Sequence, residues 1–406
     1  MRVGVLTTSF PRTPDDSAGS FVLGFARALR ATGADVEILA PEPRECIAPL
    51  REPGLRVRHV RYLWPRSLQR TFYSAGVPDN LRRDPLAWLG PLPFSLALAH
   101  HARAACSRWD AIVSHWALPC ALAAARVRGI KPHLAVLHSA DVHALCHLPG
   151  AERWARRIAC GSDGLWFVTQ AHCDRFFDLL PARERPALRK RAWVAPMGID
   201  LPARTAGERE RARRELRLTG FAVLALGRLV PVKGIDVLLR ASQGRPWTLL
   251  IAGDGPERAT WEAQARATGV DARFFGAVTG TQKSLLLTAA DACAVPSRVL
   301  PSGRSEGLPV ALLEAMAHGL PVVASAVGGI PALLSGPDRA GLLVPPDRPD
   351  DLAHAIERLR IDTELRAQLG AVARVCAERH RWSRAIEPAV ALLSPAHRHA
   401  EITPSP

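Results

Sequence analysis

The chain has 406 residues, of which 48% are hydrophobic and 22% charged, the composition of a globular protein and not of a disordered or fibrous one. At ~150 residues per domain this length predicts two or three domains, with cores that need no metal or disulfide support. The net charge of +15 at pH 7 indicates an acidic partner, but it fits nucleic acid, anionic lipid and phosphorylated metabolites equally.

Cysteine spacing and apolar runs indicate the cellular compartment of the protein. The eight cysteines are spread singly, with no C-x-x-C pair, which argues against a zinc ribbon, an iron–sulfur site or a secreted disulfide framework. The first ten residues hold no long apolar run, and the stretches 86–99 and 320–334 are interrupted and short of a ~20-residue membrane span. We therefore expect a cytoplasmic protein, with any membrane contact at the inner face of the cell membrane.

Short apolar runs alternate with amphipathic stretches along almost the whole chain. In the first half a helix is predicted over 21–32, and strands are predicted over 3–7, 36–40, 111–114, 134–138 and 165–168. In the second half strands are predicted over 223–227, 248–253, 292–295, 322–324 and 342–344. Strands that alternate with helices favour parallel sheets covered by helices on both faces, so the expected fold class is α/β.

A domain boundary is predicted near residue 203. The sequence PMGID at 196–200 has turn chemistry, and a charge-rich stretch separates it from the next strand. Two doubly wound halves, 1–203 and 204–381, would leave a cleft at the carboxyl ends of both sheets. The last amphipathic stretch, about 382–395, is expected to pack back on the first half.

Loops after predicted strands of the first half carry candidate site residues. Gly19 would let a backbone or ligand approach closely, with Ser20 capping the helix that follows. His115 and His138 each follow a buried strand, and two imidazoles at equivalent strand ends favour a functional site over two structural histidines. The N-terminal loop has no G-x-G-x-x-G pattern and the histidines have no metal-site spacing, so neither a nicotinamide cofactor nor a metal is expected.

In the second half the sequence EGLPVALLE carries two carboxylates, Glu306 and Glu314. A helix is predicted to begin with Pro309 at its first position and to end before the next glycine. The free amides of Gly307 and Leu308 at its start would form an anion site, and carboxylates accept hydrogen bonds from sugar hydroxyls. Most helical glutamates are solvated, but the neighbours of Glu314 are apolar, which favours a ligand-binding role.

The loop GRLVPVKG at 227–234 follows a predicted strand and precedes a helix. Arg228 and Lys233 could converge there on one diphosphate and neutralise it without a metal ion. Two solvated surface charges are an equally good explanation of this pair taken alone. The turn AGDGP at 252–256 is expected to shape the site without doing chemistry.

These segments resemble a known family. EGLPVALLEAMAHGLPVVAS at 306–325, GRL-x3-KG at 227–234, AGDGP and PMGID are similar to the group 1 (family 4) retaining glycosyltransferases of the GT-B superfamily. SFP and GSFV within 9–22, HWALP at 115–119 and HSADV at 138–142 resemble bacterial members that build exopolysaccharides of the colanic-acid type. The resemblance covers nearly all of 1–395 and implies two Rossmann-like domains that face each other across a cleft.

The resemblance also implies which domain binds each substrate. The second domain would hold a UDP- or GDP-linked sugar, and the first a glycan or lipid-linked acceptor. The implied donor-binding residues are Arg228, Lys233, Gly307, Leu308 and Glu314 (at the ribose), with Gly19 approaching the diphosphate from the opposite domain. The implied catalytic residues are Glu306, in contact with the transferred sugar, and His138 beside it, and the acceptor-side candidates are His115 and Asp141. No cofactor and no metal is implied.

Retention of configuration, which the resemblance implies, fits a reaction in which the bond to the diphosphate loosens and the acceptor attacks from the same face. Arg228 and Lys233 would stabilise the negative charge that develops on the departing phosphate. Glu306 could in principle be a covalent nucleophile, as in retaining glycosidases. The resemblance favours the route without that intermediate.

The excess positive charge suggests a contact with anionic membrane. Two basic stretches are interleaved with apolar and aromatic residues: Arg51, Arg56, Arg58, Arg61, Leu63, Trp64, Arg66, Arg70, Phe72 and Tyr73, and then Trp154, Arg156, Arg157 and Ile158. Such a surface could lie on lipid headgroups. A general arginine bias of the composition explains the same charges equally well.

Two other functions remain open from the residues alone. A nucleotide-sugar epimerase or phosphorylase could share the fold, although a phosphorylase needs a lysine for pyridoxal phosphate and the chain has four lysines in all. A basic nucleic-acid-binding protein would explain the charge, but no helix-turn-helix, zinc-finger or RNP motif accompanies it.

Overall fold

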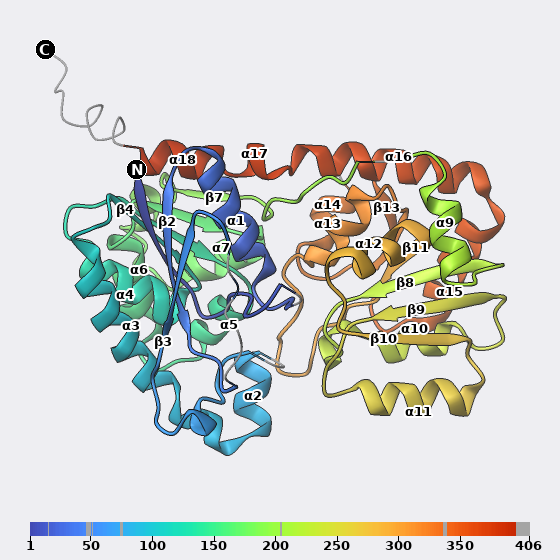
Figure 1. Ribbon diagram of the computed structural model, residues 1–406, viewed down its shortest axis with the longest axis horizontal. Helices are drawn as coiled ribbons and strands as arrows, with labels where there is room; N and C mark the ends of the chain where they lie inside the picture. Colours follow the sequence, from blue (N-terminus) through green and yellow to red (C-terminus); the bar gives the residue numbers. More distant parts are fainter. Residues whose placement is uncertain are drawn as a thin grey trace, which may run out of the picture. The chain divides into compact units, whose positions relative to one another are not determined.

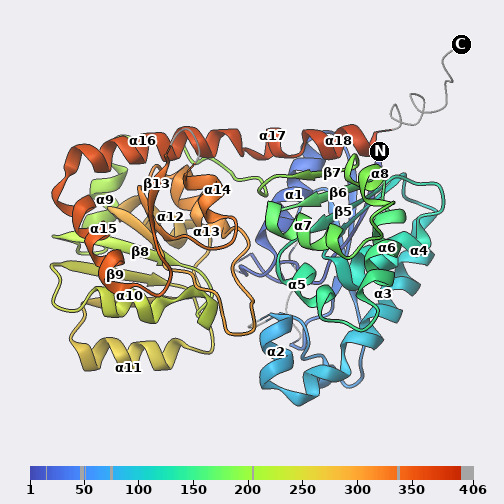
Figure 2. The ribbon, with the colours of Figure 1, turned by 180° about the vertical axis from the view of Figure 1, so that it is seen from behind.

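The computed structural model describes residues 1–14, 16–45, 50, 52–73, 76–203, 205–335 and 339–394, so Arg51 lies outside the described residues. The chain divides into two compact units, here called the first and second unit (Figures 1 and 2). The first unit is Met1–Gly198 together with the chain from Trp382 onward, and the second is Ile199–Arg381.

The first unit is built on a parallel sheet of seven strands. Within the described residues their order is β3-β2-β1-β4-β5-β6-β7. The strands are β1 Arg2–Leu6, β2 Asp35–Pro41, β3 Leu55–Val60, β4 Ala111–His115, β5 His133–Leu137, β6 Gly164–Phe167 and β7 Ala192–Val194. β1, β4, β5 and β6 are buried almost throughout, as expected for strands with helices on both faces.

Helices cover both faces of this sheet. They are α1 Ser20–Ala31, α2 Val77–Arg83, α3 Pro91–Cys106, α4 Leu122–Val127, α5 Ala140–Cys146, α6 Ala151–Cys160, α7 Gln170–Asp178, α8 Arg185–Arg189, α17 Trp382–Ala385 and α18 Glu387–Leu393. Short turns of helix are η1 Arg66–Leu68, η2 Pro85–Leu89 and η3 Ala117–Ala121. One core holds α1, α17 and α18 against the sheet, a second holds α3 and α4, and a third lies under α5, α6 and α7.

The second unit is a parallel sheet of six strands in the order β10-β9-β8-β11-β12-β13. The strands are β8 Phe221–Leu226, β9 Trp247–Ala252, β10 Ala272–Gly276, β11 Ala292–Val295, β12 Val322–Ser325 and β13 Gly341–Val344. The helices are α9 Glu208–Glu215, η4 Pro231–Lys233, α10 Ile235–Ala241, α11 Arg258–Thr268, α12 Gly280–Ala289, α13 Val310–Ala317, α14 Ile330–Leu334, α15 Pro349–Ile361 and α16 Thr363–Arg379. One core lies under α12, α13 and α16, and the other under α10, α11 and α15.

Every strand predicted from the sequence coincides with an observed strand to within two residues, and the predicted α/β class is confirmed. The three strands that were not predicted, β3, β7 and β10, all lie at sheet edges. β3 and β10 carry arginine among their apolar residues, because an edge strand is less completely covered, and β7 is only three residues long. Continuous apolar runs therefore identified all the central strands and one edge strand, β13.

The last helices of the chain complete the first unit. Trp382 is 9% exposed and belongs to the core that α1 covers, with its ring 6.4 Å from the ring of Phe25. Two glycines make room for the indole: a Cβ added at Gly24 or Gly198 would lie 2.6 or 2.4 Å from Trp382. Residues 382–394 are thus part of the packing of this unit, and not an appendage to it.

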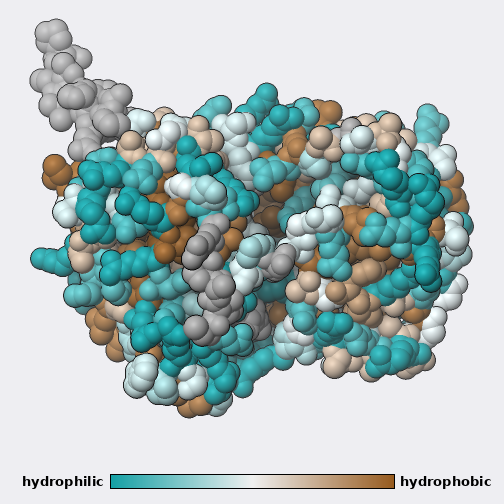
Figure 3. Space-filling model, in the orientation of Figure 1, coloured by the Kyte–Doolittle hydropathy of each residue, from teal (hydrophilic) through white to brown (hydrophobic). Residues whose placement is uncertain are grey.

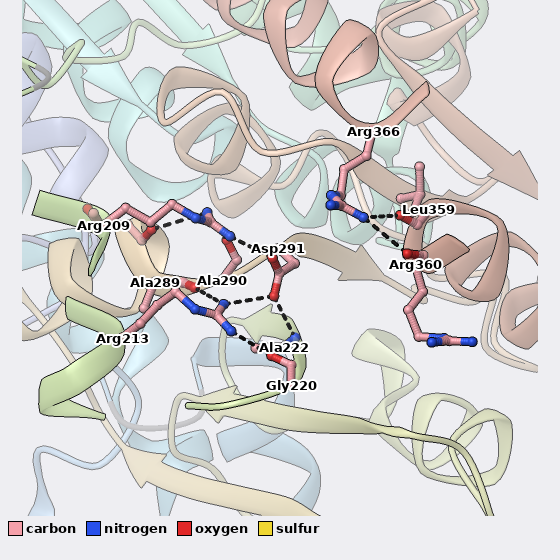
Figure 4. A network of polar contacts seen from close by, with 11 residues as sticks. Arg209, Arg213, Gly220, Ala222, Ala289, Ala290, Asp291, Leu359, Arg360 and Arg366 are labelled. Atoms are coloured by element: carbon pink, nitrogen blue, oxygen red, sulfur yellow. Dashed lines mark hydrogen bonds and ion pairs between the residues drawn. The ribbon is translucent and has the colours of Figure 1, made fainter. Parts of the chain in front are cut away.

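A network of charged side chains fixes α9 to the amino ends of the strands in the second unit (Figure 4). Asp291, just before β11, accepts hydrogen bonds from Arg209 Nη2 at 2.6 Å, Arg213 Nη1 at 2.9 Å and the amide of Ala222 at 2.8 Å. The two arginines also donate to carbonyl oxygens of Ala289, Ala290 and Gly220. Because the site described next lies at the opposite, carboxyl ends of the strands, this network is structural.

Candidate functional site

The loop after β8 is shaped by glycines that admit close backbone approach. Gly234 has φ +62°, and a Cβ there would lie 2.0 Å from the carbonyl oxygen of Pro296. A Cβ at Gly253, in the AGDGP turn, would lie 1.8 Å from the carbonyl oxygen of Gly227. The amide of Gly227 donates to the carbonyl of Ala252, so this turn holds the loop against the end of β9.

Lys233, in η4 of this loop, forms an ion pair with Glu306. Lys233 Nζ lies 2.7 Å from Glu306 Oε2, and each side chain is 17% exposed. Arg228, at the start of the same loop, is exposed. The structure therefore brings together two of the predicted site residues, one from each of two separate motifs.

Glu306 is held by the turn at Gly328-Gly329. Gly328 has φ +58°, and a Cβ there would lie 1.9 Å from the carbonyl oxygen of Glu306. The amide of Gly329 donates to the carbonyl of Gly307 at 2.7 Å. The two glycines thus support the backbone of the Glu306 loop from behind.

The helix predicted from Pro309 begins one residue later, at Val310, with Pro309 at the N-cap position. The amides of Gly307 and Leu308 lie in the segment just before the helix, as predicted, one residue further from its first turn. Gly307 is buried, and Leu308 packs against the core. The predicted C-terminus is confirmed, since Gly319 follows the helix with φ +65°.

Glu314 lies in the second turn of α13 and pairs with Lys283 of α12. The distance from Lys283 Nζ to Glu314 Oε1 is 2.6 Å, with the carboxylate side chain 15% exposed. Burial and the nearby Glu314 raise the pKa of the Cys293 thiol to about 12. Sequence reasoning missed Lys283, although it is one of only four lysines and could have been examined as a partner for each isolated acid.

In the first unit, Gly19 occupies the N-cap of α1 with φ +66°. A Cβ there would lie 2.4 Å from the carbonyl oxygen of Ser9, so packing within the N-terminal loop alone requires glycine. The prediction that Ser20 caps α1 is wrong: Ser20 is the first helical residue, and no side chain caps this helix.

His115, the last residue of β4, and His138, just after β5, are joined by a hydrogen bond. His115 Nδ1 lies 3.2 Å from His138 Nε2. The two ring planes differ by 14° and the ring centroids are 5.4 Å apart. This centroid distance is close to the sum of the N···N distance and the distances from each bonded nitrogen to the centre of its own ring. The rings therefore meet edge to edge in a common plane, as an N–H···N bond requires, and do not stack face to face.

Asp141, in the first turn of α5, joins the loops that carry the two histidines. Its Oδ2 accepts from the amide of Ala117 at 2.8 Å and from the amide of His138 at 3.3 Å. Its Oδ1 is buried without a hydrogen-bond partner. The acceptor-side candidates His115 and Asp141 and the catalytic candidate His138 are thus in one cluster.

Burial dominates the electrostatics of this histidine cluster. It lowers the pKa of His138 to about 3 and the pKa of His115 well below its usual value. Burial also raises the pKa of Asp141 to about 6, against the opposing effect of the backbone amides that bond to it. Both imidazoles are therefore neutral near pH 7.

The structure bears on several other sequence predictions. Among the described residues no group of three or more His, Cys, Asp or Glu could hold a metal ion, and no described helix is both long and apolar enough to cross a bilayer. Phe72, Tyr73 and Ile158 are buried, so the prediction that they face lipid is wrong. Trp64, from the same prediction, is 77% exposed.

Comparison with known proteins identifies the family. A model described as "Glycosyl transferases group 1" matches residues 207–375. A D-inositol 3-phosphate glycosyltransferase of Actinosynnema mirum is 30% identical over 403 residues, covering 90% of this chain and 89% of that protein. The chain is a group 1 glycosyltransferase.

Other relatives of this group 1 glycosyltransferase differ in their named substrates. A GDP-mannose-dependent alpha-(1-6)-phosphatidylinositol monomannoside mannosyltransferase of Mycobacterium tuberculosis is 34% identical over 275 residues, covering 64% of this chain and 68% of that protein. Among solved structures, sucrose-phosphate synthase of Thermosynechococcus elongatus matches with TM-score 0.71 at 22% identity, covering 99% of both chains. The Anabaena protein HepE, solved with UDP, matches with TM-score 0.68 at 19% identity, covering 99% of this chain and 100% of that chain.

These comparisons confirm the GT-B fold class of the group 1 glycosyltransferase. They also decide for a sugar transferase over the nucleotide-sugar epimerase and nucleic-acid-binding alternatives that the sequence left open.

Proposed function

We propose that the protein is a retaining glycosyltransferase that binds its nucleotide-sugar donor in the second unit and its acceptor in the first. The observation that carries the donor site is the Lys233–Glu306 pair, which joins the loop after β8 to the segment before α13. A donor diphosphate would compete with Glu306 for the ammonium, leaving the carboxylate free to accept from a sugar hydroxyl.

Glu314 would bond the ribose of the donor, and Lys283 supports this assignment because it orients the carboxylate at 2.6 Å. Arg228 and Lys233 would stabilise the phosphate as the anomeric bond breaks, and the acceptor would attack from the same face. His138 beside the transferred sugar, and Gly19 at the diphosphate, stay predictions.

For the donor we propose GDP-mannose as the first candidate, ahead of a UDP-sugar, because several relatives are named as GDP-mannose-dependent. For the acceptor we propose a phosphorylated inositol, free or lipid-linked, as the names of the relatives suggest. The expected role in exopolysaccharide synthesis stays a prediction. The expected localisation at the inner face of the cell membrane also stays a prediction.

A binding and transfer experiment tests this proposal. Thermal shift with GDP, UDP and their sugars should raise the melting temperature for one base, because a ligand that binds only the native state stabilises it. Lys233→Met should lower kcat by ~10²–10³, the typical cost of losing one group that stabilises developing charge. The exposed Lys190 provides the control: Lys190→Met should keep full activity. Near-full turnover by Lys233→Met would refute the donor-site assignment.

A further inference from the structure

Large hydrophobic side chains are exposed mainly on one stretch of the first unit. Of the twelve that are exposed in the described part of the chain, six lie within residues 64–96. They are Trp64, Leu86, Trp88, Leu89, Leu92 and Leu96, here called the apolar patch. Trp64, Trp88 and Leu92 are 77%, 66% and 69% exposed, so the patch is open to solvent.

The six side chains belong to elements that contact one another. η2, which carries the residues from Leu86 to Leu89, contacts η1, α2 and α3. The indole N–H of Trp88 donates to the carbonyl of Leu81 in α2 at 2.8 Å. Leu92 and Leu96 are one turn apart on the exposed side of α3. Trp64 lies two residues before η1, so the six side chains form one continuous patch.

Arginines surround the apolar patch. Arg82 and Arg83 are exposed in the last turn of α2, and the guanidinium of Arg61 lies 5.6 Å from the ring centre of Trp64. Residues 61–96 contain five arginines and two acids, and Glu42 pairs with Arg61 and Arg66, so the local balance is 5 − 3 = +2. In Figure 3, brown and teal surfaces meet at the lower rim of the first unit, on the side where Figure 1 places α2.

We propose that the apolar patch and the arginines around it dock the first unit on a bilayer with anionic headgroups. Tryptophan and leucine side chains favour the boundary between headgroups and acyl chains, and arginines at the same level are attracted to anionic lipid. The apolar patch therefore suits the boundary with the acyl chains, and the arginines around it suit the anionic headgroups. This inference goes beyond the proposed function, since it needs neither a particular sugar nor a particular nucleotide.

The test is co-sedimentation of the full-length protein with vesicles of phosphatidylcholine that contain 0 or ~30% phosphatidylglycerol, an amount that makes the surface clearly anionic. Arg82→Gln with Arg83→Gln should weaken partition to the anionic vesicles about 30-fold, at roughly fivefold per arginine. Leu92→Ser with Leu96→Ser should weaken it at least tenfold. Matched controls are Arg211→Gln with Arg266→Gln, and Ile361→Ser with Val375→Ser, all exposed in the second unit.

The result expected is loss of binding in the patch variants and wild-type binding in both controls. Equal partition of patch and control variants would overturn the proposal. Absence of co-sedimentation of the wild-type protein with anionic vesicles at low salt would also overturn it. A wild-type dimer that Leu92→Ser with Leu96→Ser converts to a monomer would assign the patch to a second copy of the chain instead.

A second, independent observation concerns the bond between His115 and His138. His115 is fully buried, and its Nε2 has no hydrogen-bond partner. If His138 donated the shared proton, the proton of His115 would be on Nε2, leaving a buried N–H without an acceptor. An unsatisfied buried donor costs about 1–3 kcal/mol, so the favoured tautomer has the proton on His115 Nδ1. His138 then accepts at Nε2 and carries its own proton on Nδ1.

We propose that His115 is a positioning residue that fixes His138 as the Nδ1–H tautomer. His138 is only half-buried, so its Nδ1–H is the group left for a ligand oxygen. In that state the nitrogen donates a hydrogen bond and cannot accept a proton. This part of the inference rests on the proposed function only for its kinetic consequence, because the tautomer can be observed without substrate.

Nitrogen-15 NMR of the histidine side chains tests this assignment. His133 is an internal reference, because its Nδ1 lies 2.8 Å from the carbonyl of Gly161 and must be the protonated nitrogen there. His138 should give the same tautomer signature as His133. His115→Phe should move His138 away from that tautomer without changing His133, and His115→Gln, whose amide can donate, should restore it.

Kinetics provide the second readout. His115→Phe should lower kcat about tenfold with donor KM within twofold, less than the ~10² that loss of a whole donor group costs. A wild-type His138 protonated on Nε2, or a tautomer unchanged in His115→Phe, would overturn the assignment. Neither result would bear on the donor site, which the Lys233 variant tests separately.

Discussion

Gly328 illustrates how single residues hold the candidate donor site in place. It has φ +58°, and its α-carbon faces the carbonyl oxygen of Glu306, which a Cβ would approach to 1.9 Å. Side chains are strained at this φ, and here the backbone of the Glu306 loop blocks the only space available. The position of the catalytic candidate therefore depends on a glycine more than twenty residues away in the chain.

We predict that Gly328→Ala lowers the free energy of unfolding by about 3 kcal/mol, from strain at positive φ and the backbone clash together. The shifted Glu306 should also lower kcat/KM at least tenfold. Denaturant unfolding and steady-state kinetics measure the two effects. Gly269→Ala is the matched control: it has φ +67° with nothing within 4 Å of the added Cβ, so only the ~1 kcal/mol of backbone strain should appear. Equal losses in the two variants would contradict the role of the Glu306 contact.

Sequence reasoning at this scale identified residue types but not their partners. Glu306 and Lys233 were each singled out by their loops, yet nothing in a 73-residue separation indicates that they meet at 2.7 Å. The pairing of Glu314 with Lys283 was missed for the same reason. Long-range ion pairs depend on how parallel strands are ordered in the sheet, which local patterns do not contain.

Among the elements, α9 is held less by apolar burial than by charge. Only Ala212 of its eight residues is buried, so its position depends on Arg209, Arg213 and their shared acceptor Asp291. Asp291 is 11% exposed as a side chain, and it also accepts from the amide of Ala222 at the start of β8. Removing the Asp291 carboxylate takes a hydrogen-bond acceptor away from two guanidinium groups and one backbone amide.

Asp291→Ala should therefore destabilise the second unit by about 2–3 kcal/mol, the range for hydrogen bonds to charged groups that are lost together. Because the network lies at the amino ends of the strands, kcat of the folded protein should stay within twofold of wild type. Urea unfolding and kinetics below the transition check both statements. Glu215→Ala, exposed on the same helix, should change stability by no more than ~0.5 kcal/mol. A large fall in kcat would show that α9 reaches the active site.

Most strands that the sequence revealed are those that the fold buries most, with the edge strand β13 as the exception. The central strands are continuous apolar runs, whereas β3, with the sequence LRVRHV, exposes both of its arginines at the sheet edge. Apart from Trp64, the exposed apolar patch was also missed, because leucines in η2 and α3 look like core residues in a sequence. A pattern of hydrophobicity does not separate a buried face from an exposed one.

At the scale of the whole molecule, the two units should respond differently to acid. Burial lowers the pKa of His133, His138 and His172 in the first unit to about 4, 3 and 4, and lowers the pKa of His115 as well. In the second unit burial lowers the pKa of His318 and His380. The unfolded chain binds protons at these imidazoles near pH 6.5, while the native first unit does not.

A histidine with a lowered native pKa contributes stability that is present above pH 6.5 and is lost as pH falls toward the native value. The free energy of unfolding of the first unit should therefore fall steeply between pH 6.5 and 4, by up to about 3 kcal/mol for each of His133 and His172. Asp141 acts in the opposite sense, since its pKa, raised to about 6, removes stability as pH rises from 4 through 6. Burial also lowers the pKa of His59 and His101 in this unit, so Asp141 is one group against six and the histidines dominate the window.

Hydrogen exchange read by mass spectrometry can follow each unit separately across this pH range. The first unit should lose protection at a higher pH than the second. In His133→Gln the protection of the first unit should fall less steeply with decreasing pH. That variant removes the titrating imidazole, while its amide can still donate to Gly161 and accept from the hydroxyl of Ser114, two of the partners of the His133 ring. Simultaneous loss of both units, or an unchanged slope in His133→Gln, would mean that the buried histidines do not set the acid limit of the fold. The pH dependence would then have to come from the carboxylates that pair with arginine throughout the chain.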